Sequence, residues 1–137
     1  MTKTTTHRGS CHCGAIRYEV DLDLAGKATQ CNCSICRKTM WTGAQVKPEA
    51  FRVLAGEAEA GQYVWGHKVS ARFFCKTCGV HCYGRGELEM LGGKFVGVNV
   101  NTLDDVDVGL LDITHWDGRH DNWQSGMRAK PWPISAG

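Results

Sequence analysis

The chain has 137 residues, of which 42% are hydrophobic and 22% are charged, as in one globular domain with its own apolar core. The formal net charge is only +2 and the basic residues are dispersed, which argues against a dedicated nucleic-acid binder. No segment approaches the roughly 18 apolar residues of a membrane span, and the polar N-terminal stretch does not resemble a secretory signal. We therefore expect a single domain over residues 1–137 that is cytoplasmic and has no membrane or nucleic-acid partner.

Short apolar runs separated by glycine and aspartate predict a mainly β fold of antiparallel strands. In the first run, Ile16, Tyr18 and Val20 alternate with polar side chains, as in a half-buried strand. Two runs at 62–65 and 69–75 flank a short turn at 66–68 and predict a hairpin. Further strands are expected at residues 51–54, 80–83 and 94–100.

Little helix is expected. Residues 34–39 can form one turn with Ser34 as its N-cap, and residues 103–107 can form another. The segment from residue 117 onward is polar and aromatic, and we expect an irregular tail over the domain, held by Trp123 and Trp132. Exposed strand edges are compatible with a homodimer.

Seven of the eight cysteines fall into three clusters. In a chain without a secretory signal, clustered cysteines indicate metal ligands or reactive thiols rather than disulfides. The clusters are Cys11-x-Cys13, Cys31-x-Cys33-x-x-Cys36 and Cys75-x-x-Cys78.

The first and third clusters together supply the four thiolates of a closed zinc site. A C-x-x-C-G turn directs both sulfurs at one ion, because the glycine, here Gly79, adopts the positive φ that tight turning needs. Spacing alone permits other partitions, and four thiolates suit iron as well as zinc. The predicted ligands are Cys11, Cys13, Cys75 and Cys78.

The middle cluster then has three ligands and no obvious fourth. Three protein ligands and an open position are typical of a catalytic zinc, at which water or a substrate thiol binds. This reasoning predicts a catalytic metal held by Cys31, Cys33 and Cys36. The alternative is a structural second site, completed by His12, His67 or His81.

The polar residues near these clusters carry weaker signals. Arg37 and Lys38 either meet a substrate carboxylate or are solvated surface charges, and the second interpretation is slightly favoured. Asn32 and Ser34 flank the middle cluster and could hydrogen-bond sulfur or substrate. Cys82 is expected to be a buried core thiol. No catalytic role is assigned to His115 or His120.

The segments GSCHCG at residues 9–14, CNCSIC at 31–36 and FCKTCG at 74–79 resemble the glutathione-dependent formaldehyde-activating enzyme family, whose domain centromere protein V shares. The resemblance covers residues 7–116 and leaves 117–137 as the irregular tail. It implies a β-tent of small antiparallel sheets with two zinc ions per chain. The structural ion would be held by Cys11, Cys13, Cys75 and Cys78, and the catalytic ion by Cys31, Cys33 and Cys36.

The resemblance also implies an activity. The type reaction condenses formaldehyde with glutathione to S-hydroxymethylglutathione, which is a carbon–sulfur lyase reaction in reverse. The expected partners are therefore a glutathione-like thiol and formaldehyde or another small electrophile. Two alternatives are a zinc-stabilised protein-binding module without catalysis and a lyase acting on a different, larger electrophile.

Overall fold

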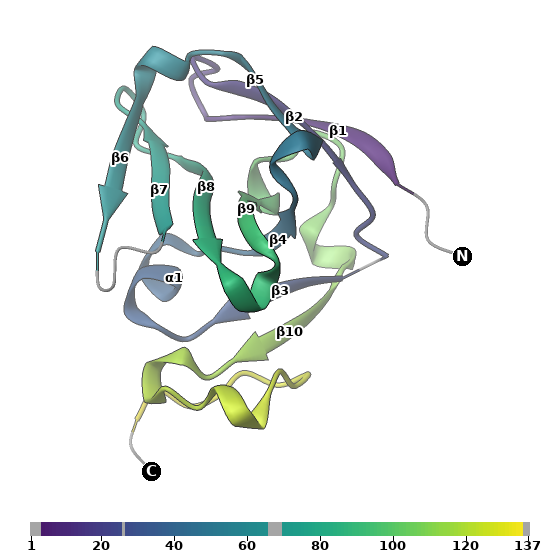
Figure 1. Ribbon diagram of the computed structural model, residues 1–137, viewed down its shortest axis with the longest axis vertical. Helices are drawn as coiled ribbons and strands as arrows, with labels where there is room; N and C mark the ends of the chain where they lie inside the picture. The colour runs from purple at the N-terminus through teal and green to yellow at the C-terminus, as the bar shows by residue number, and fades with distance from the viewer. Residues whose placement is uncertain (1–3, 26, 66–69, 136–137) are drawn as a thin grey trace.

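The computed structural model describes residues 4–25, 27–65 and 70–135, and these fold into two β-sheets with one short α-helix (Figure 1). One sheet has the strand order β1-β2-β5, and the other has the order β10-β3-β4-β9-β8-β7-β6. The strands are β1 (Thr5–Ser10), β2 (Arg17–Leu22), β3 (Lys27–Cys31), β4 (Gly43–Val46), β5 (Phe51–Ala55), β6 (Ala60–Val64), β7 (Ser70–Cys75), β8 (His81–Leu88), β9 (Gly93–Asn99) and β10 (Asp112–Trp116).

The helical elements are short. The α-helix is α1 (Ser34–Thr39), and the others are single 3-10 turns. No helix in the described ranges is long and apolar enough to cross a membrane. The 3-10 turns are η1 (Pro48–Ala50), η2 (Glu57–Glu59), η3 (Glu89–Leu91), η4 (Val100–Thr102), η5 (Val108–Leu110), η6 (Gly118–His120) and η7 (Trp123–Ser125).

The predicted mainly β fold of small sheets is confirmed, with one departure from antiparallel pairing. Strands β6 and β7 form the expected antiparallel pair, and the predicted turn at 66–68 lies outside the described residues. Strand β10 instead pairs in parallel with β3, so that Trp116 lies opposite Cys31. Figure 1 shows β10 and the segment after it below β3, at the end of the molecule farthest from β1, β2 and β5.

The core lies between the two sheets and is centred on three aromatic rings. Tyr18 of β2 and Phe51 of β5 pack against each other with ring centroids 5.4 Å apart, and Phe51 lies 4.8 Å from the ring of Tyr83 in β8. Alternation in β2 buries Tyr18 and Val20 while Arg17 faces solvent, as the period of two predicts. Joining side chains from both sheets in one cluster removes apolar surface from water and fixes the sheets relative to each other.

The buried hydroxyl of Tyr18 has a partner in the segment after β9. Its oxygen lies 2.6 Å from Oγ1 of Thr102, which donates to the backbone carbonyl of Asn99 at 2.7 Å. The tyrosine hydroxyl therefore donates to Thr102. Burial raises the pKa of Tyr18, because the phenolate would lose hydration in the core.

Two local predictions differ from the structure. Helix α1 spans the predicted residues, but its N-cap is Cys33 rather than Ser34, and no side chain caps it. The predicted helical turn at residues 103–107 is wrong, because η4 and η5 form on either side of it. Each is initiated by an Asx cap: Asn99 accepts from the amide of Asn101, and Asp107 accepts from that of Gly109.

The segment after β10 is irregular apart from η6 and η7, and one backbone bridge joins His115 to Arg128. Of the two tryptophans predicted to hold it, Trp132 is half-buried and donates its indole N–H to the carbonyl of His115 at 2.9 Å. Trp123 is 51% exposed, and its ring is tilted against that of Trp116 with ring centroids 5.7 Å apart. Trp132 is therefore the stronger attachment.

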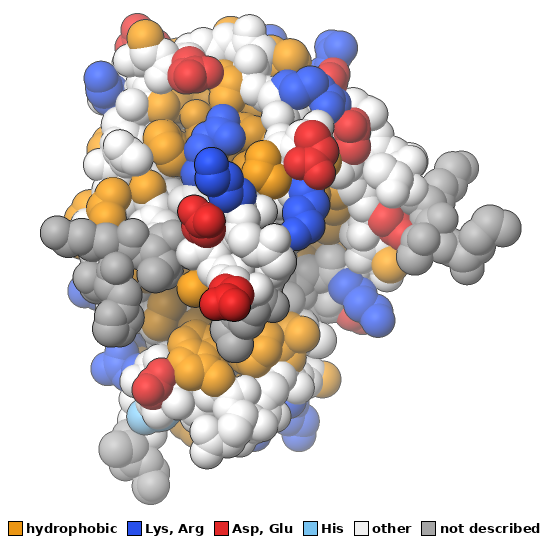
Figure 2. Space-filling view, in the orientation of Figure 1, with side chains coloured by type: hydrophobic (Ala, Val, Ile, Leu, Met, Phe, Trp, Pro, Cys, Tyr) orange, Lys and Arg blue, Asp and Glu red, His pale blue; other side chains and the backbone are white. Residues whose placement is uncertain are grey.

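The surface carries both charges side by side. Figure 2 shows one face on which basic and acidic side chains adjoin rather than separate into patches. Arg52, for example, donates to Glu19 at 2.9 Å and to Asp21 at 2.8 Å across neighbouring strands of the three-stranded sheet. Hydrogen bonds from this guanidinium lower the pKa of Asp21 to about 2.

Replacing Tyr18 by Phe should lower the free energy of unfolding by about 1 kcal/mol, because the ring packing stays while the hydrogen bond to Thr102 is lost. Urea denaturation measures the change. The matched control is Tyr63→Phe at a half-exposed ring, for which the change should stay within about 0.5 kcal/mol. Equal effects at both positions would contradict a structural role for the Tyr18 hydroxyl.

Candidate metal centre and adjoining pocket

Four cysteines from two segments about 62 positions apart in the sequence meet in one group. Cys11 and Cys13 follow β1, Cys75 ends β7, and Cys78 lies in the next turn. Their four sulfurs all lie within 4.8 Å of one another. Two of the separations, Cys11 to Cys13 and Cys13 to Cys75, are 3.6 Å. The structure thus brings together the first and third clusters in the predicted combination.

These distances suit a tetrahedral zinc ion. With Zn–S bonds of about 2.3 Å, neighbouring sulfurs in a tetrahedron are about 3.8 Å apart. Backbone amides also point at the sulfurs: Ile16 donates to Cys11 at 3.3 Å, and the amides of Thr77 and Cys78 donate to Cys75 at 3.4 Å. Such donors stabilise thiolates, so the geometry and the donor set both fit a four-cysteine metal site.

The local backbone favours ionised sulfur. Hydrogen bonds from the amides of Cys13 and Val80 lower the pKa of Cys78 to about 6, and the amide of Cys78 is the main cause of a lowered pKa at Cys75. The turn depends on Gly79, whose φ of +80° is the conformation predicted from the C-x-x-C-G pattern. A side chain at this position would strain the backbone that holds the ligands.

The eighth cysteine does not belong to this group. Cys82 is fully buried within the hydrophobic core, as predicted for a structural thiol. Burial raises its pKa to about 12, so that it stays protonated at neutral pH.

The middle cluster lies where β3 leads into α1, at the other end of the seven-stranded sheet. Cys31 ends β3, Cys33 is the N-cap of α1, and Cys36 lies within that helix. Within the described ranges, only the four-cysteine group has its ligand atoms at metal-binding separations, so these three thiols do not form a second such group. Neither His12 nor His81 joins a metal-binding group, and His67 lies outside the described residues.

The three thiols of the middle cluster nevertheless shift one another's pKa. Hydrogen bonding to Cys31 and then to Cys36 lowers the pKa of the Cys33 thiol. Hydrogen bonding to Cys31 and then to Cys33, together with burial, raises the pKa of the Cys36 thiol. Of these two thiols, Cys33 is therefore the one whose ionisation the cluster favours.

Arg72 contacts this cluster from β7, although the sequence patterns did not single it out. Its Nη2 lies 3.3 Å from the sulfur of Cys36, and its guanidinium carbon lies 3.7 Å from the ring centre of Trp41. Trp65 lies farther off, at 5.5 Å. The other terminal nitrogen, Nη1, is buried without a hydrogen-bond partner in the described residues. A cation held by an aromatic face next to a thiol favours the thiolate.

Asp117 holds the loop between Cys31 and Cys33 from the opposite side. Its carboxylate is 5% exposed and accepts from Asn32 at 2.8 Å, from His120 at 2.8 Å and from Asn122 at 3.2 Å. Asn32 in turn accepts from the amide of Arg119 at 2.9 Å. Burial alone would raise the pKa of Asp117, but these hydrogen bonds bring it below the usual value.

Gly118 shows how closely the tail approaches the middle cluster. A Cβ added to this residue would lie 2.6 Å from the sulfur of Cys31 and 2.7 Å from the ring of Trp123. Any larger residue would displace the Cys31 sulfur or the Trp123 ring, so only glycine fits there. The signal in the sequence was the Asp-Gly pair, which indicates a turn but not its contact with a thiol.

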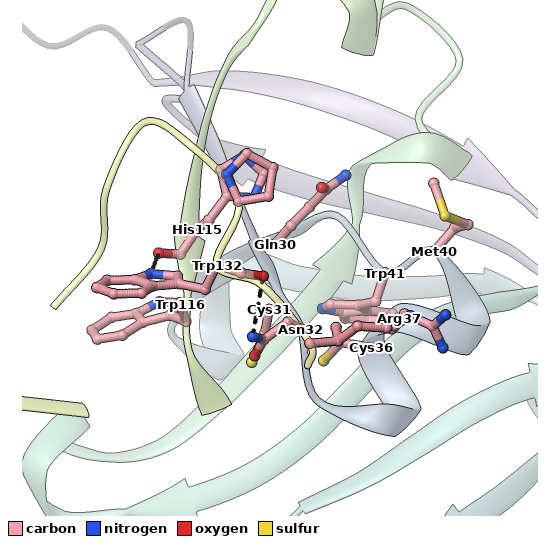
Figure 3. Close-up of a pocket in the computed structure, with 12 residues that line it drawn as sticks. Gln30, Cys31, Asn32, Cys36, Arg37, Met40, Trp41, His115, Trp116 and Trp132 are labelled. Atoms are coloured by element: carbon pink, nitrogen blue, oxygen red, sulfur yellow. Dashed lines mark hydrogen bonds between the residues drawn. The ribbon is translucent and has the colours of Figure 1, made fainter. Parts of the chain in front are cut away.

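A pocket of about 200 Å³ opens beside the middle cluster. In Figure 3, Trp116 and Trp132 lie on one side, Trp41 and Cys36 lie on the other, and Cys31 and Asn32 lie between them. We call this cavity the tryptophan pocket. It is lined by Gln30, Cys31, Asn32, Cys36, Arg37, Met40, Trp41, His115, Trp116, Pro131, Trp132 and Ile134.

The weaker predictions near the middle cluster have mixed outcomes. Arg37 is exposed and lines the pocket, whereas Lys38 is exposed and does not. Asn32 is held by Asp117, and Ser34 lines a second, more open cavity beside Cys33. His120 borders that second cavity, so it lies closer to the cysteines than its place in a polar tail suggested.

Replacing Cys78 by Ala should remove bound zinc from the four-cysteine group and lower the free energy of unfolding by about 4 kcal/mol or more, because this group joins the two sheets. Metal analysis and thermal unfolding measure both effects. Cys33→Ala is the matched control and should keep that ion and most of the stability. A Cys78→Ala protein with unchanged zinc and melting temperature would contradict the assignment.

Replacing Asp117 by Asn should cost most stability near neutral pH. Because the folded-state pKa is lowered, the carboxylate stabilises the fold above the unfolded pKa of about 3.9, and this contribution is lost as pH falls through the folded pKa. The wild-type advantage in free energy of unfolding should therefore shrink below about pH 4. Urea denaturation of both proteins at several pH values measures the difference, and an advantage that stays constant with pH would contradict this role of Asp117.

Comparison with known proteins gives the family. The profile of "Glutathione-dependent formaldehyde-activating enzyme" matches residues 6–118, which include all eight cysteines. A Rhodobacter sphaeroides protein of known crystal structure aligns with a TM-score of 0.64 and 32% identity over 73% of this chain and 90% of that one.

A Halomonas elongata protein described as "Putative glutathione-dependent formaldehyde-activating enzyme" is 51% identical over 35 residues, covering 26% of this chain and 22% of the relative. The match to this relative therefore spans less than a quarter of its length. The family profile, in contrast, spans most of the chain and contains both cysteine groups. The chain belongs to the glutathione-dependent formaldehyde-activating enzyme family.

Proposed function

We propose that the protein adds a glutathione-like thiol to formaldehyde or another small aldehyde, and so acts as a carbon–sulfur lyase in the reverse direction. The observation that carries this proposal is the position of Cys31 and Cys36 in the wall of the tryptophan pocket. A small electrophile in this pocket lies next to the cysteine cluster. Membership of the family supplies the reaction class.

We also propose two zinc ions per chain in one domain over residues 1–137. The four-cysteine group holds the structural ion. Cys31, Cys33 and Cys36, which do not lie at metal-binding separations in this structure, would close around the second ion, which when bound would supply the Lewis acidity that keeps an incoming thiol ionised. Three thiolates and one Zn²⁺ sum to a charge of −1, and the guanidinium of Arg72 at 3.3 Å from Cys36 balances it.

The chemistry is an addition without oxidation or reduction. The thiol loses its proton, the sulfur attacks the carbonyl carbon, and the carbon–oxygen π bond breaks. The proton then ends on the former carbonyl oxygen, and the product is a hemithioacetal. The enzyme's main contribution is to hold the two reactants in line, because positioning alone removes several kcal/mol of the barrier.

The surrounding residues keep the cluster in one geometry. Asp117 fixes the side chain of Asn32 between Cys31 and Cys33, and Arg72 fixes the sulfur of Cys36. Both partners are themselves restrained, Asp117 by two further hydrogen bonds and Arg72 by the ring of Trp41. A site supported in this way needs little rearrangement when a substrate binds.

Zinc content and thiol-addition rate, measured with and without excess glutathione, test this function. Exchange NMR of the aldehyde gives the rate above spontaneous addition. We expect two zinc ions in the wild type and one in Cys33→Ser, with the rate reduced by at least about 100-fold and the fold retained. Cys82→Ala removes a thiol outside both groups and should keep both ions and the rate.

Two outcomes would refute parts of this proposal. One tightly held zinc in both wild type and Cys33→Ser, with no effect of glutathione and no rate enhancement, would support a binding module and refute the catalytic proposal. Loss of both ions in Cys33→Ser would refute two independent sites.

A further inference from the structure

The tryptophan pocket has an unusual lining for a site expected to bind formaldehyde alone. Three of the five tryptophans in the chain line it, together with apolar side chains from the tail. Formaldehyde is far too small and polar to contact so many rings. An aromatic wall of this kind binds flat apolar groups, because each buried ring removes a large apolar area from water.

The tail side of the pocket is held by specific bonds. Trp132 donates to the carbonyl of His115 at 2.9 Å, and its ring lies 3.8 Å from the guanidinium carbon of Arg128. Arg128 also donates to the carbonyl of Pro131 at 2.8 Å, and Arg119 donates to that of Ile134 at 3.0 Å. The tail is therefore fixed as a wall beside Cys31.

The pocket has the wrong charge and size to enclose a tripeptide thiol. Its volume of about 200 Å³ is below the roughly 300–1,000 Å³ of sites for drug-sized ligands. No aspartate, glutamate or lysine lines it, and Arg37 is the one arginine of its lining. Two carboxylates and one ammonium group buried there would have Arg37 as their one charged partner in the lining, which is costly. The body of glutathione must therefore lie outside.

From these observations we propose that the tryptophan pocket binds the flat apolar substituent of an uncharged aldehyde, and that Trp41, Trp116 and Trp132 select aryl-substituted aldehydes over formaldehyde-sized ones. This inference rests on the proposed function, because it names the electrophile of the same site. With the substituent among the tryptophans, the carbonyl carbon lies at the cysteine end, beside Cys31 and Cys36.

The reaction is the same addition of a thiol to an aldehyde as in the proposed function. The thiol sulfur bonds to the carbonyl carbon, the π bond breaks, and the thiol proton ends on the oxygen. No oxidant, reductant or further reactant is needed. The gain comes from binding, and even one methylene group in an apolar pocket changes selectivity by about 10- to 200-fold.

The test compares phenylacetaldehyde with acetaldehyde, whose carbonyls have similar intrinsic reactivity, using glutathione as the thiol. The wild type should show kcat/KM at least about tenfold higher for phenylacetaldehyde. Trp132→Ala should bring the ratio close to one. Met127→Ala removes an exposed apolar side chain of the same tail that is outside the pocket lining, and should keep the wild-type ratio.

A binding measurement separates the pocket from the chemistry. The unreactive probe 2-phenylethanol should change tryptophan fluorescence in a saturable way in the wild type, with an apparent Kd at least tenfold weaker in Trp132→Ala. If no aldehyde reacts but the probe still saturates and Trp132→Ala weakens it, the proposed function fails and the apolar site stands.

Two results would overturn the inference itself. One is equal kcat/KM for both aldehydes in an active wild-type enzyme. The other is a preference, or probe binding, that Trp132→Ala leaves unchanged. Absence of both activity and probe binding would remove the inference and the proposed function together.

Discussion

The contact on which the structure most depends is the group of four sulfurs between the two sheets. Cys11 and Cys13 follow a strand of the three-stranded sheet, and Cys75 ends a strand of the seven-stranded one. Four ionised thiolates at 3.6–4.8 Å repel one another unless a cation lies between them. Metal binding and the packing of one sheet on the other are therefore coupled, and the aromatic core next to this group forms only when both sheets are in place.

The middle cluster is built on a different principle. Its three cysteines are local in sequence, on one loop and one helical turn, but the groups that restrain them come from far away. Arg72 reaches Cys36 from β7, and Asp117 reaches Asn32 from the end of β10. The parallel pairing of β10 with β3 brings Asp117 to this position. The middle cluster, which lies on a loop, is therefore restrained by contacts from β7 and from the segment after β10.

Much of this arrangement follows from local patterns in the sequence. The period of two in β2, the glycine after Cys78 and the counting of thiolates predict strands, a turn and a four-cysteine group, because each depends on neighbouring residues. The contacts of Arg72 and Asp117 that restrain the middle cluster cannot be predicted from such local patterns. An arginine in an apolar strand gives no sign of a cysteine 36 positions away, and an Asp-Gly pair indicates a turn rather than a buried carboxylate. Long-range contacts between single residues leave no periodic signal.

The two cysteine groups lie in different parts of the fold, and this separation affects which substitutions alter stability and which alter the pocket. The four-cysteine group and the core occupy the body of the fold, so changes there alter stability. The tryptophan pocket takes three of its twelve lining residues from the segment after β10, which is irregular and contributes little to the core. Residues such as Trp132 can therefore change without loss of the metal group. Under the proposed function, the middle cysteine cluster would supply the reaction, and the tryptophan pocket, with Trp132 from the tail, would select the electrophile.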